Sequence, residues 1–180
     1  MAAIRETCEE TLVLLAGPKG ATGAEPHCIS GEEMLVVREG PVGGAGDFFT
    51  WLESASFRPF TENLIYFAHW ITPEANPHRF STHFFLVEAP QNLLVVPDSR
   101  EIKEHLWLNP REALEKQSNG EIHLMAPTAK NLELLSNFDS TAEAVEVLQT
   151  REVDTIMPKI RFGEKGDRIV LYPWDPEYGQ

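Results

Sequence analysis

Apolar positions at the start of the chain recur with the period of a helix. Four of them stand at i, i+4, i+8 and i+11 and therefore share one helical face: Ile4, Cys8, Leu12 and Leu15. We predict a helix over residues 2–15, which Gly17-Pro18 ends. The glycines and prolines that follow predict a loop over residues 16–30.

Helix-start signals recur further along the chain. The predicted helices span residues 31–39, 48–55, 110–116, 128–137 and 141–149. A capping side chain or a proline in the first turn marks each start, respectively Ser30, Asp47, Pro110, Thr128 and Ser140. Glu33 and Glu143 complete capping boxes with the two serines.

Aromatic and β-branched runs predict strands between these helices. They cover residues 64–71, 80–87, 154–162 and 168–172, and residues 163–167 form the turn between the last pair. Asn119-Gly120 is typical of a turn. The pattern indicates a mixed organisation of helices around strands, in one domain over residues 1–180 with no internal repeat.

Composition and charge narrow the class of protein. The 180 residues carry a net charge of −13, which argues against nucleic acid as a partner, because duplex binding depends on Lys and Arg. No apolar run is long enough for a membrane span, and the N-terminus lacks the pattern of a signal peptide. Two cysteines, Cys8 and Cys28, are too few for a disulfide scaffold. We therefore expect a cytoplasmic protein of unknown oligomeric state.

Three carboxylates are concentrated in the first predicted helix. Glu6, Glu9 and Glu10 fall within about 100° of arc, opposite the apolar stripe. Arg5 stands four residues before Glu9 and can pair with it. Mg²⁺ prefers carboxylate oxygens, so such a cluster is a candidate metal site. By spacing alone, however, a solvated acidic helix face is the favoured interpretation.

The same residues resemble a known motif. Arg5-Glu6-Thr7-Cys8-Glu9-Glu10-Thr11-Leu12-Val13 is similar to the second half of the Nudix box, Arg-Glu-(apolar)-x-Glu-Glu-x-Gly-(apolar). Thr7 replaces an apolar residue and Leu12 replaces the usual glycine, so we expect the helix to continue past Leu12. The box also has a Gly and a Glu before its Arg-Glu pair. The chain starts four residues before Arg5, and we expect either a fragment or a shortened protein.

The resemblance continues in register along most of the chain. Residues 69–73 and 79–86 are similar to "W-(apolar)-T-P … R-F-D-T-x-F-F-(apolar)", with Ser81 in place of the Asp. Residues 101–114 resemble "E-(apolar)-x-E-x-x-W-(apolar)-x-P-x-E-A-L", and residues 126–128 and 172–178 also fit. This set resembles the Nudix branch that includes peroxisomal coenzyme A diphosphatases and their bacterial relatives.

The resemblance implies a fold, a reaction and roles for residues. The fold is an α/β/α Nudix sandwich with a mixed sheet, lacking its first strands. The activity is hydrolysis of a diphosphate in a nucleoside diphosphate derivative, a small-molecule partner for which coenzyme A or acyl-CoA is favoured. Glu9 and Glu10 bind Mg²⁺ or Mn²⁺, with Glu6 as a further candidate ligand. Glu6 acts as the general base and Arg5 orients it. The alternatives are a non-catalytic binding or regulatory module and an ADP-ribose or nucleotide-sugar diphosphatase.

Other residues have weaker claims to a role in the site. Glu101 or Glu104 is a candidate for an additional carboxylate, and a surface charge is an equal alternative. Arg79 is a weak candidate for substrate binding, as are the nearby His69, His78 and His83, although a structural role is favoured for all of them. We expect Cys8 to be a buried small hydrophobe, and four aromatic residues to belong to the core, namely Trp70, Phe80, Phe84 and Phe85.

Overall fold

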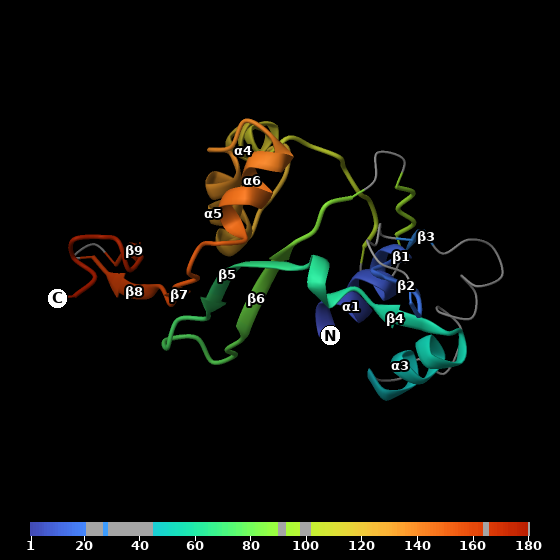
Figure 1. Cartoon of the computed structure of the whole chain (residues 1–180). Helices are drawn as coiled ribbons and strands as arrows, with labels where there is room; N and C mark the ends of the chain where they lie inside the picture. The colour runs from blue at the N-terminus through green and yellow to red at the C-terminus, as the bar shows by residue number, and fades with distance from the viewer. Residues whose placement is uncertain (21–26, 29–44, 90–92, 98–101, 164–165, 180) are drawn as a thin grey trace. The chain divides into compact units, whose positions relative to one another are not determined.

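The computed structural model describes residues 1–20, 27–28, 45–89, 93–97, 102–163 and 166–179 (Figure 1). Contacts divide the chain into two compact units. The first comprises Met1–Leu64 and Val87–Trp107, and the second comprises Ile65–Leu86 and Leu108–Gln180. The expectation of one domain over residues 1–180 stays a prediction. None of the helices in the described ranges combines the length and apolar composition that a membrane crossing requires.

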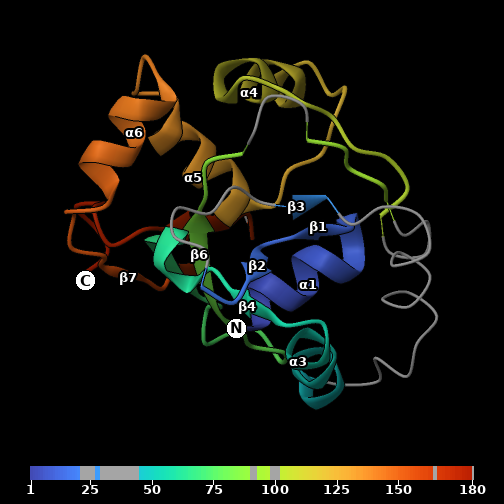
Figure 2. The ribbon, with the colours of Figure 1, turned by 45° about the vertical axis from the view of Figure 1, so that its right-hand side comes forward.

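The first unit is built around its N-terminal helix. Its elements are α1 (Ala2–Thr11), β1 (Val13–Leu14), β2 (Ala16–Pro18), β3 (His27–Cys28), α3 (Ala45–Ser54), β4 (Phe57–Pro59) and the 3-10 helix η1 (Thr61–Asn63). Strand β1 pairs antiparallel with β3, and β2 pairs antiparallel with β4. Figure 2 shows α1 beside β1 and β2, with α3 nearby.

One apolar cluster joins α1 to its neighbours in this unit. Ile4 and Cys8 contribute from α1, Leu12 to Ala16 from the segment after it, and Phe48 and Leu52 from α3. Cys8 is fully buried, which confirms its predicted place in the core. Gly17 lies against the ring of Phe60, and a Cβ at this position would overlap that ring. The packing of the Phe60 ring against β2 therefore depends on glycine here.

The predicted helix over residues 2–15 is right in its first part and wrong in its last. Helix α1 ends at Thr11, and the strands Val13–Leu14 and Ala16–Pro18 follow it. Leu12 to Leu15 are all buried, because these residues pack on more than one side rather than along a single stripe. Strands β2 and β3 also fall where the sequence predicted a loop. The helix predicted over residues 31–39 lies outside the described residues.

The second unit contains a mixed sheet covered by helices. Its strands are β5 (Ile65–Ile71), β6 (Ser81–Leu86), β7 (Thr155–Ile156), β8 (Lys159–Phe162) and β9 (Arg168–Leu171), and its helices are α4 (Pro110–Ser118), α5 (Ala126–Leu135) and α6 (Thr141–Leu148). Strand β5 pairs antiparallel with β6 and parallel with β7. Strands β8 and β9 form the predicted hairpin.

The core of the second unit lies between β5 and the helices α5 and α6. The two helices are neighbours in both ribbon views (Figures 1 and 2). Phe67, Ala68 and Trp70 face this core with Ala144 and Leu148 of α6. A register shift between Tyr66 and Ala68 explains why two adjacent strand residues, Phe67 and Ala68, are both buried.

Several details of the prediction need correction. Asp47 lies inside α3 and Thr128 inside α5, so neither is the N-cap. The strand predicted over residues 154–162 is divided into β7 and β8, and Pro158, which has no amide hydrogen for a ladder, lies between them. Phe80 is 69% exposed and Phe85 is 40% exposed, so the expectation that both belong to the core is wrong.

The predicted starts of the helices α4 and α6 are confirmed. Asn109 caps α4 by accepting a hydrogen bond from the Arg111 amide, and Pro110 occupies the first turn. Ser140 caps α6 by accepting from the Glu143 amide. The Glu143 carboxylate accepts from the amide of Asp139, so the reciprocal half of the capping box is shifted by one residue. Gly120 has a φ of 75°, as the predicted turn requires.

Candidate active site on the N-terminal helix

Arg5 organises the acidic face of α1. Its guanidinium donates to the Glu9 carboxylate, one helical turn away, with an Nη1–Oε2 distance of 2.6 Å. It also donates to the carboxylate of Glu6. The expected pairing of Arg5 with Glu9 is confirmed, and the same side chain braces Glu6. A planar guanidinium with several donors can hold two carboxylates at once, which a lysine ammonium does less rigidly.

The electrostatics of this group follow from the two ion pairs. The hydrogen bond to Glu9 raises the pKa of Arg5, and the charges of Glu9 and Glu6 add to the effect against desolvation, which lowers it. Arg5 therefore stays protonated and fixes the orientation of both carboxylates. Side-chain exposure is 49% for Glu6 and 26% for Glu9, so Glu6 is the more accessible to solvent.

Glu9 keeps an unused acceptor. Its second oxygen, Oε1, is buried and has no hydrogen-bond partner among the described residues. A buried carboxylate oxygen without a partner is costly, and a divalent cation is one group that would satisfy it. The oxygen chemistry of Glu9 thus fits a Mg²⁺ or Mn²⁺ ligand. Glu10 is half-buried on the same turn.

A complete set of metal ligands is not assembled by the described residues. Within those ranges, no three His, Cys, Asp or Glu side chains converge where a metal ion could bind. Arg5 holds Glu6 and Glu9 through its own donors, so the guanidinium compensates part of their negative charge. Glu101 lies outside the described residues, and Glu104 is exposed. The roles predicted for these carboxylates stay predictions.

The end of α1 departs from the expected course. Leu12 has φ 58° and ψ 21°, a left-handed conformation, and its amide donates to the Cys8 carbonyl. Leu12 stands at the position where the Nudix box has glycine. Because α1 ends at Thr11, the prediction that the helix continues past Leu12 is wrong. The Thr11 hydroxyl donates to the Thr7 carbonyl, and the Val96 amide donates to the Thr11 carbonyl at 2.9 Å. These bonds close the helix at the same place as a glycine would.

Arg79, His69 and His83 make contacts within the second unit. Arg79 donates from Nε to the Thr72 carbonyl at 3.1 Å and from Nη2 toward the Met157 sulfur. These contacts brace the connection between β5 and β6, and a contact of Arg79 with substrate stays a prediction. His78 is exposed.

His69 has both ring nitrogens in hydrogen bonds. Nδ1 is 2.9 Å from the Thr155 hydroxyl, and Nε2 is 2.8 Å from the hydroxyl of Ser81, the residue that stands in place of the motif's Asp. Either ring nitrogen can donate to or accept from a hydroxyl, and the tautomer of the ring sets the direction of each bond. The ring of His69 also stacks on His83 with centroids 4.2 Å apart.

Sequence reasoning missed a pocket of about 680 Å³ in the second unit. Asn131 lines it from α5 and is only 6% exposed. The available signal was an asparagine on the same face of the predicted helix as Leu134 and Leu135, where a polar residue needs a partner. Trp174, which also lines the pocket, lies in residues 172–178, for which the sequence indicates only a resemblance to the family pattern.

Relatives of known sequence match most of the chain. It is 27% identical over 195 residues to acyl-coenzyme A diphosphatase NUDT19 of Xenopus laevis, covering 97% of this chain and 51% of the relative. The protein of the same name from Gallus gallus is 27% identical over 206 residues, with 98% and 52% covered. Putative nudix hydrolase 7 of Caenorhabditis elegans is 28% identical over 136 residues, with 76% and 43% covered. The chain spans about half the length of the curated relatives it matches.

A solved structure and a family model agree with these matches. The crystal structure of a Nudix hydrolase from Alicyclobacillus acidocaldarius superposes with a TM-score of 0.69 at 24% identity, covering 83% of this chain and 65% of that one. The family model of the NUDT19 Nudix domain matches residues 1–135. The chain therefore belongs to the NUDT19 Nudix-domain family and has the α/β Nudix fold.

Proposed function

We propose that the protein hydrolyses a diphosphate linkage in a nucleoside diphosphate derivative, with coenzyme A or an acyl-CoA as the favoured substrate. Membership of the family carries the proposal, together with the names of the frog and chicken relatives. The observation on the molecule that supports it most directly is the arrangement of Arg5, Glu6 and Glu9 on α1.

The proposed roles come from the resemblance of residues 5–13 to the family motif, and the contacts and exposure of these side chains support them. Glu6, the more exposed carboxylate, accepts a proton from the attacking water. Arg5 holds that carboxylate in one orientation and remains charged throughout. Glu9, with its unpartnered buried oxygen, and Glu10 beside it hold a divalent cation, Mg²⁺ or Mn²⁺. When bound, this cation neutralises the diphosphate and polarises the phosphorus centre.

The test is a substrate panel with the metal varied. Purified protein is incubated with coenzyme A, an acyl-CoA, ADP-ribose and a nucleotide sugar, with no metal, Mg²⁺ or Mn²⁺, and the phosphomonoester products are measured. We expect cleavage of the coenzyme A compounds to be fastest and to depend on metal. Faster cleavage of ADP-ribose or the nucleotide sugar would assign that substrate class instead.

A matched pair of variants separates the motif from general charge effects. Glu9→Gln should lower activity strongly, whereas Glu146→Gln on the exposed surface of α6 should not. If the wild-type protein cleaves none of the four compounds with either metal, the enzymatic proposal fails, and a non-catalytic binding or regulatory module becomes the leading alternative.

A further inference from the structure

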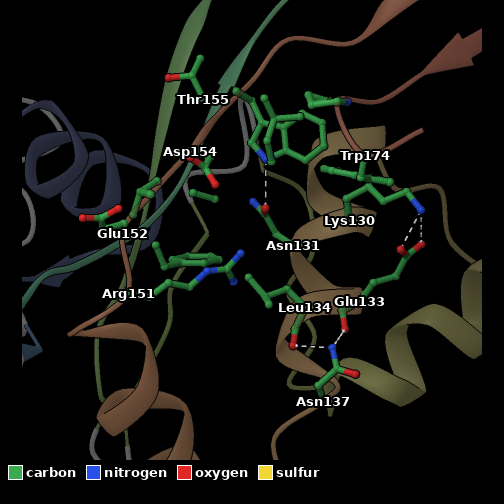
Figure 3. A pocket seen from close by; sticks show the side chains of 16 residues that line it. Lys130, Asn131, Glu133, Leu134, Asn137, Arg151, Glu152, Asp154, Thr155 and Trp174 are labelled. Atoms are coloured by element: carbon green, nitrogen blue, oxygen red, sulfur yellow. Dashed lines mark hydrogen bonds and ion pairs between the residues drawn. The ribbon is translucent and has the colours of Figure 1, made fainter. Parts of the chain in front are cut away.

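The pocket of the second unit contains a buried donor with no partner. Asn131 accepts a hydrogen bond from the indole nitrogen of Trp70 at 3.0 Å, which fixes the orientation of its amide. Its Nδ2 group is buried and has no hydrogen-bond partner among the described residues. Figure 3 shows Asn131 projecting into the middle of the pocket, between Arg151 and Asp154 on one side and Lys130 on the other.

The Asn131 amide has a hydrogen-bond donor and an acceptor site that Trp70 does not use. Nδ2 offers a donor, and Oδ1 keeps a second lone pair beyond the one used by Trp70. A donor next to an acceptor is complementary to a ligand edge with an acceptor next to an N–H donor. The N7 and amino group of adenine form such an edge, and an asparagine side chain pairs with them through two hydrogen bonds.

A flat aromatic surface lies in the same pocket. Trp174 stacks on Tyr172 with centroids 5.0 Å apart and ring planes 5° apart, and Trp174 remains 56% exposed. One face of the indole is thus supported by Tyr172, while much of its surface is open. An exposed, supported indole is a good stacking partner for a nucleobase.

The charges around the pocket favour the base over a phosphate as the recognised group. Three carboxylates and two cations line it, namely Glu133, Glu152, Asp154, Lys130 and Arg151. The Lys130 ammonium already pairs with Glu133 at 2.7 Å. An anionic group would therefore face excess negative charge, whereas a neutral ring would not. The volume of about 680 Å³ lies in the range typical of small-molecule sites.

We propose that this pocket binds an adenine ring, with Asn131 pairing with its edge and Trp174 stacking on its face. The ring can come from a free adenine nucleoside or nucleotide, or from the adenosine end of the substrate proposed above. The pairing and stacking are the same for both sources. Binding to the pocket does not require the diphosphatase activity, so the two proposals can fail separately.

The first experiment measures adenosine binding by calorimetry on the full chain, with inosine as the comparison ligand. Inosine replaces the amino group with a carbonyl and loses the donor that pairs with Oδ1, so we expect it to bind about tenfold more weakly. Asn131→Asp keeps an oxygen for Trp70 but replaces the Nδ2 donor, and should weaken adenosine binding at least tenfold. Trp174→Ala, a change at an exposed residue, should weaken it about tenfold.

Trp107→Ala serves as the control, since Trp107 is similarly exposed but lies in the other unit. It should leave adenosine binding unchanged. Absence of adenosine binding to the wild-type protein would overturn the proposal. Equal affinity in the wild type, Asn131→Asp and Trp174→Ala would overturn it as well, and the Trp174→Ala result keeps this test valid if Asn131→Asp fails to fold.

Kinetics with coenzyme A then distinguishes the two sources of the ring. If the substrate's adenosine end occupies the pocket, Asn131→Asp and Trp174→Ala raise KM and leave kcat unchanged, because the lost contact is made equally in the ground and transition states. If a free adenine compound occupies it, both variants lose adenosine affinity while KM for coenzyme A stays the same.

Discussion

Leu12 combines an unfavourable backbone with a buried side chain. Its left-handed conformation costs about 1–2 kcal/mol for a residue other than glycine. Its side chain is 1% exposed, and burial of a leucine contributes about 1.5–3 kcal/mol. Burial therefore offsets the backbone strain, which explains how leucine can occupy the position of the motif's glycine.

A pair of substitutions at Leu12 separates these two effects. Leu12→Ala loses the buried side chain and keeps a Cβ in the left-handed region, so we expect the free energy of unfolding to fall by about 2–5 kcal/mol. Leu12→Gly loses the same side chain but relieves the strain, and should be about 1 kcal/mol more stable than Leu12→Ala. Chemical denaturation measures both. A glycine variant no more stable than the alanine variant would contradict the left-handed conformation.

Glu6 provides the sharpest test of the proposed chemistry. Glu6→Gln should lower kcat about 10²–10⁴-fold with little change in KM, because a general base acts in the transition state. Arg5→Ala should also lower kcat, since it releases both Glu6 and Glu9 from their ion pairs. Steady-state kinetics with coenzyme A, with Glu146→Gln as control, measures the effects. Nearly full kcat in Glu6→Gln would place the base elsewhere, with Glu101 and Glu104 as the next candidates.

For single residues, the sequence predicts ion pairs within a helix better than it predicts backbone conformations or contacts between distant residues. The four-residue spacing of Arg5 and Glu9 is enough to predict their ion pair, because the partners lie on one helix. The backbone at the end of α1 and the orientation of the Asn131 amide depend on residues far away in the chain, namely Val96 and Trp70. Spacing along the chain carries no information on those contacts.

The helices differ in how clearly their ends are encoded. Helices α4 and α6 begin at residues whose side chains cap them, and their starts were predicted correctly. Helix α5 begins after Met125, with no side-chain cap, and its start was misplaced at Thr128. Short strands such as β1 and β2 were missed, because a run of four or five apolar residues fits a helix and a strand equally well.

The cap of α6 can be tested by itself. Ser140→Ala removes the acceptor of the Glu143 amide, so we expect the free energy of unfolding to fall by about 1 kcal/mol. Amide hydrogen exchange in the first turn of α6 should accelerate as well. Ser118→Ala is the matched control, because the Ser118 hydroxyl donates to the Glu115 carbonyl and caps no helix start. An equal loss in both variants would argue against a specific role of the Ser140 cap.

For the molecule as a whole, charge is the property with the widest consequences. A net charge of −13 disfavours the approach of an anionic diphosphate unless cations reduce the local field. The acidic face of α1 adds to this charge, and Arg5 compensates only part of it.

The family fold was predictable because several moderate matches occur in the same order as in relatives. The division into two compact units was not predicted, because each unit combines segments that are distant in sequence.

Divalent metal should stabilise the folded protein, because cations reduce the local negative field. A ligand that binds only the folded state at 100 times its Kd contributes about 2.7 kcal/mol, which raises the Tm by several degrees. We expect millimolar Mg²⁺ or Mn²⁺ to raise the Tm in calorimetry, because the unpartnered Glu9 oxygen gains a partner. The shift should disappear in a Glu9→Gln/Glu10→Gln double variant and persist in Glu146→Gln. Equal shifts in all three proteins would mean that metal acts through general charge screening, and the absence of any shift in the wild type would remove the support for a metal site on α1.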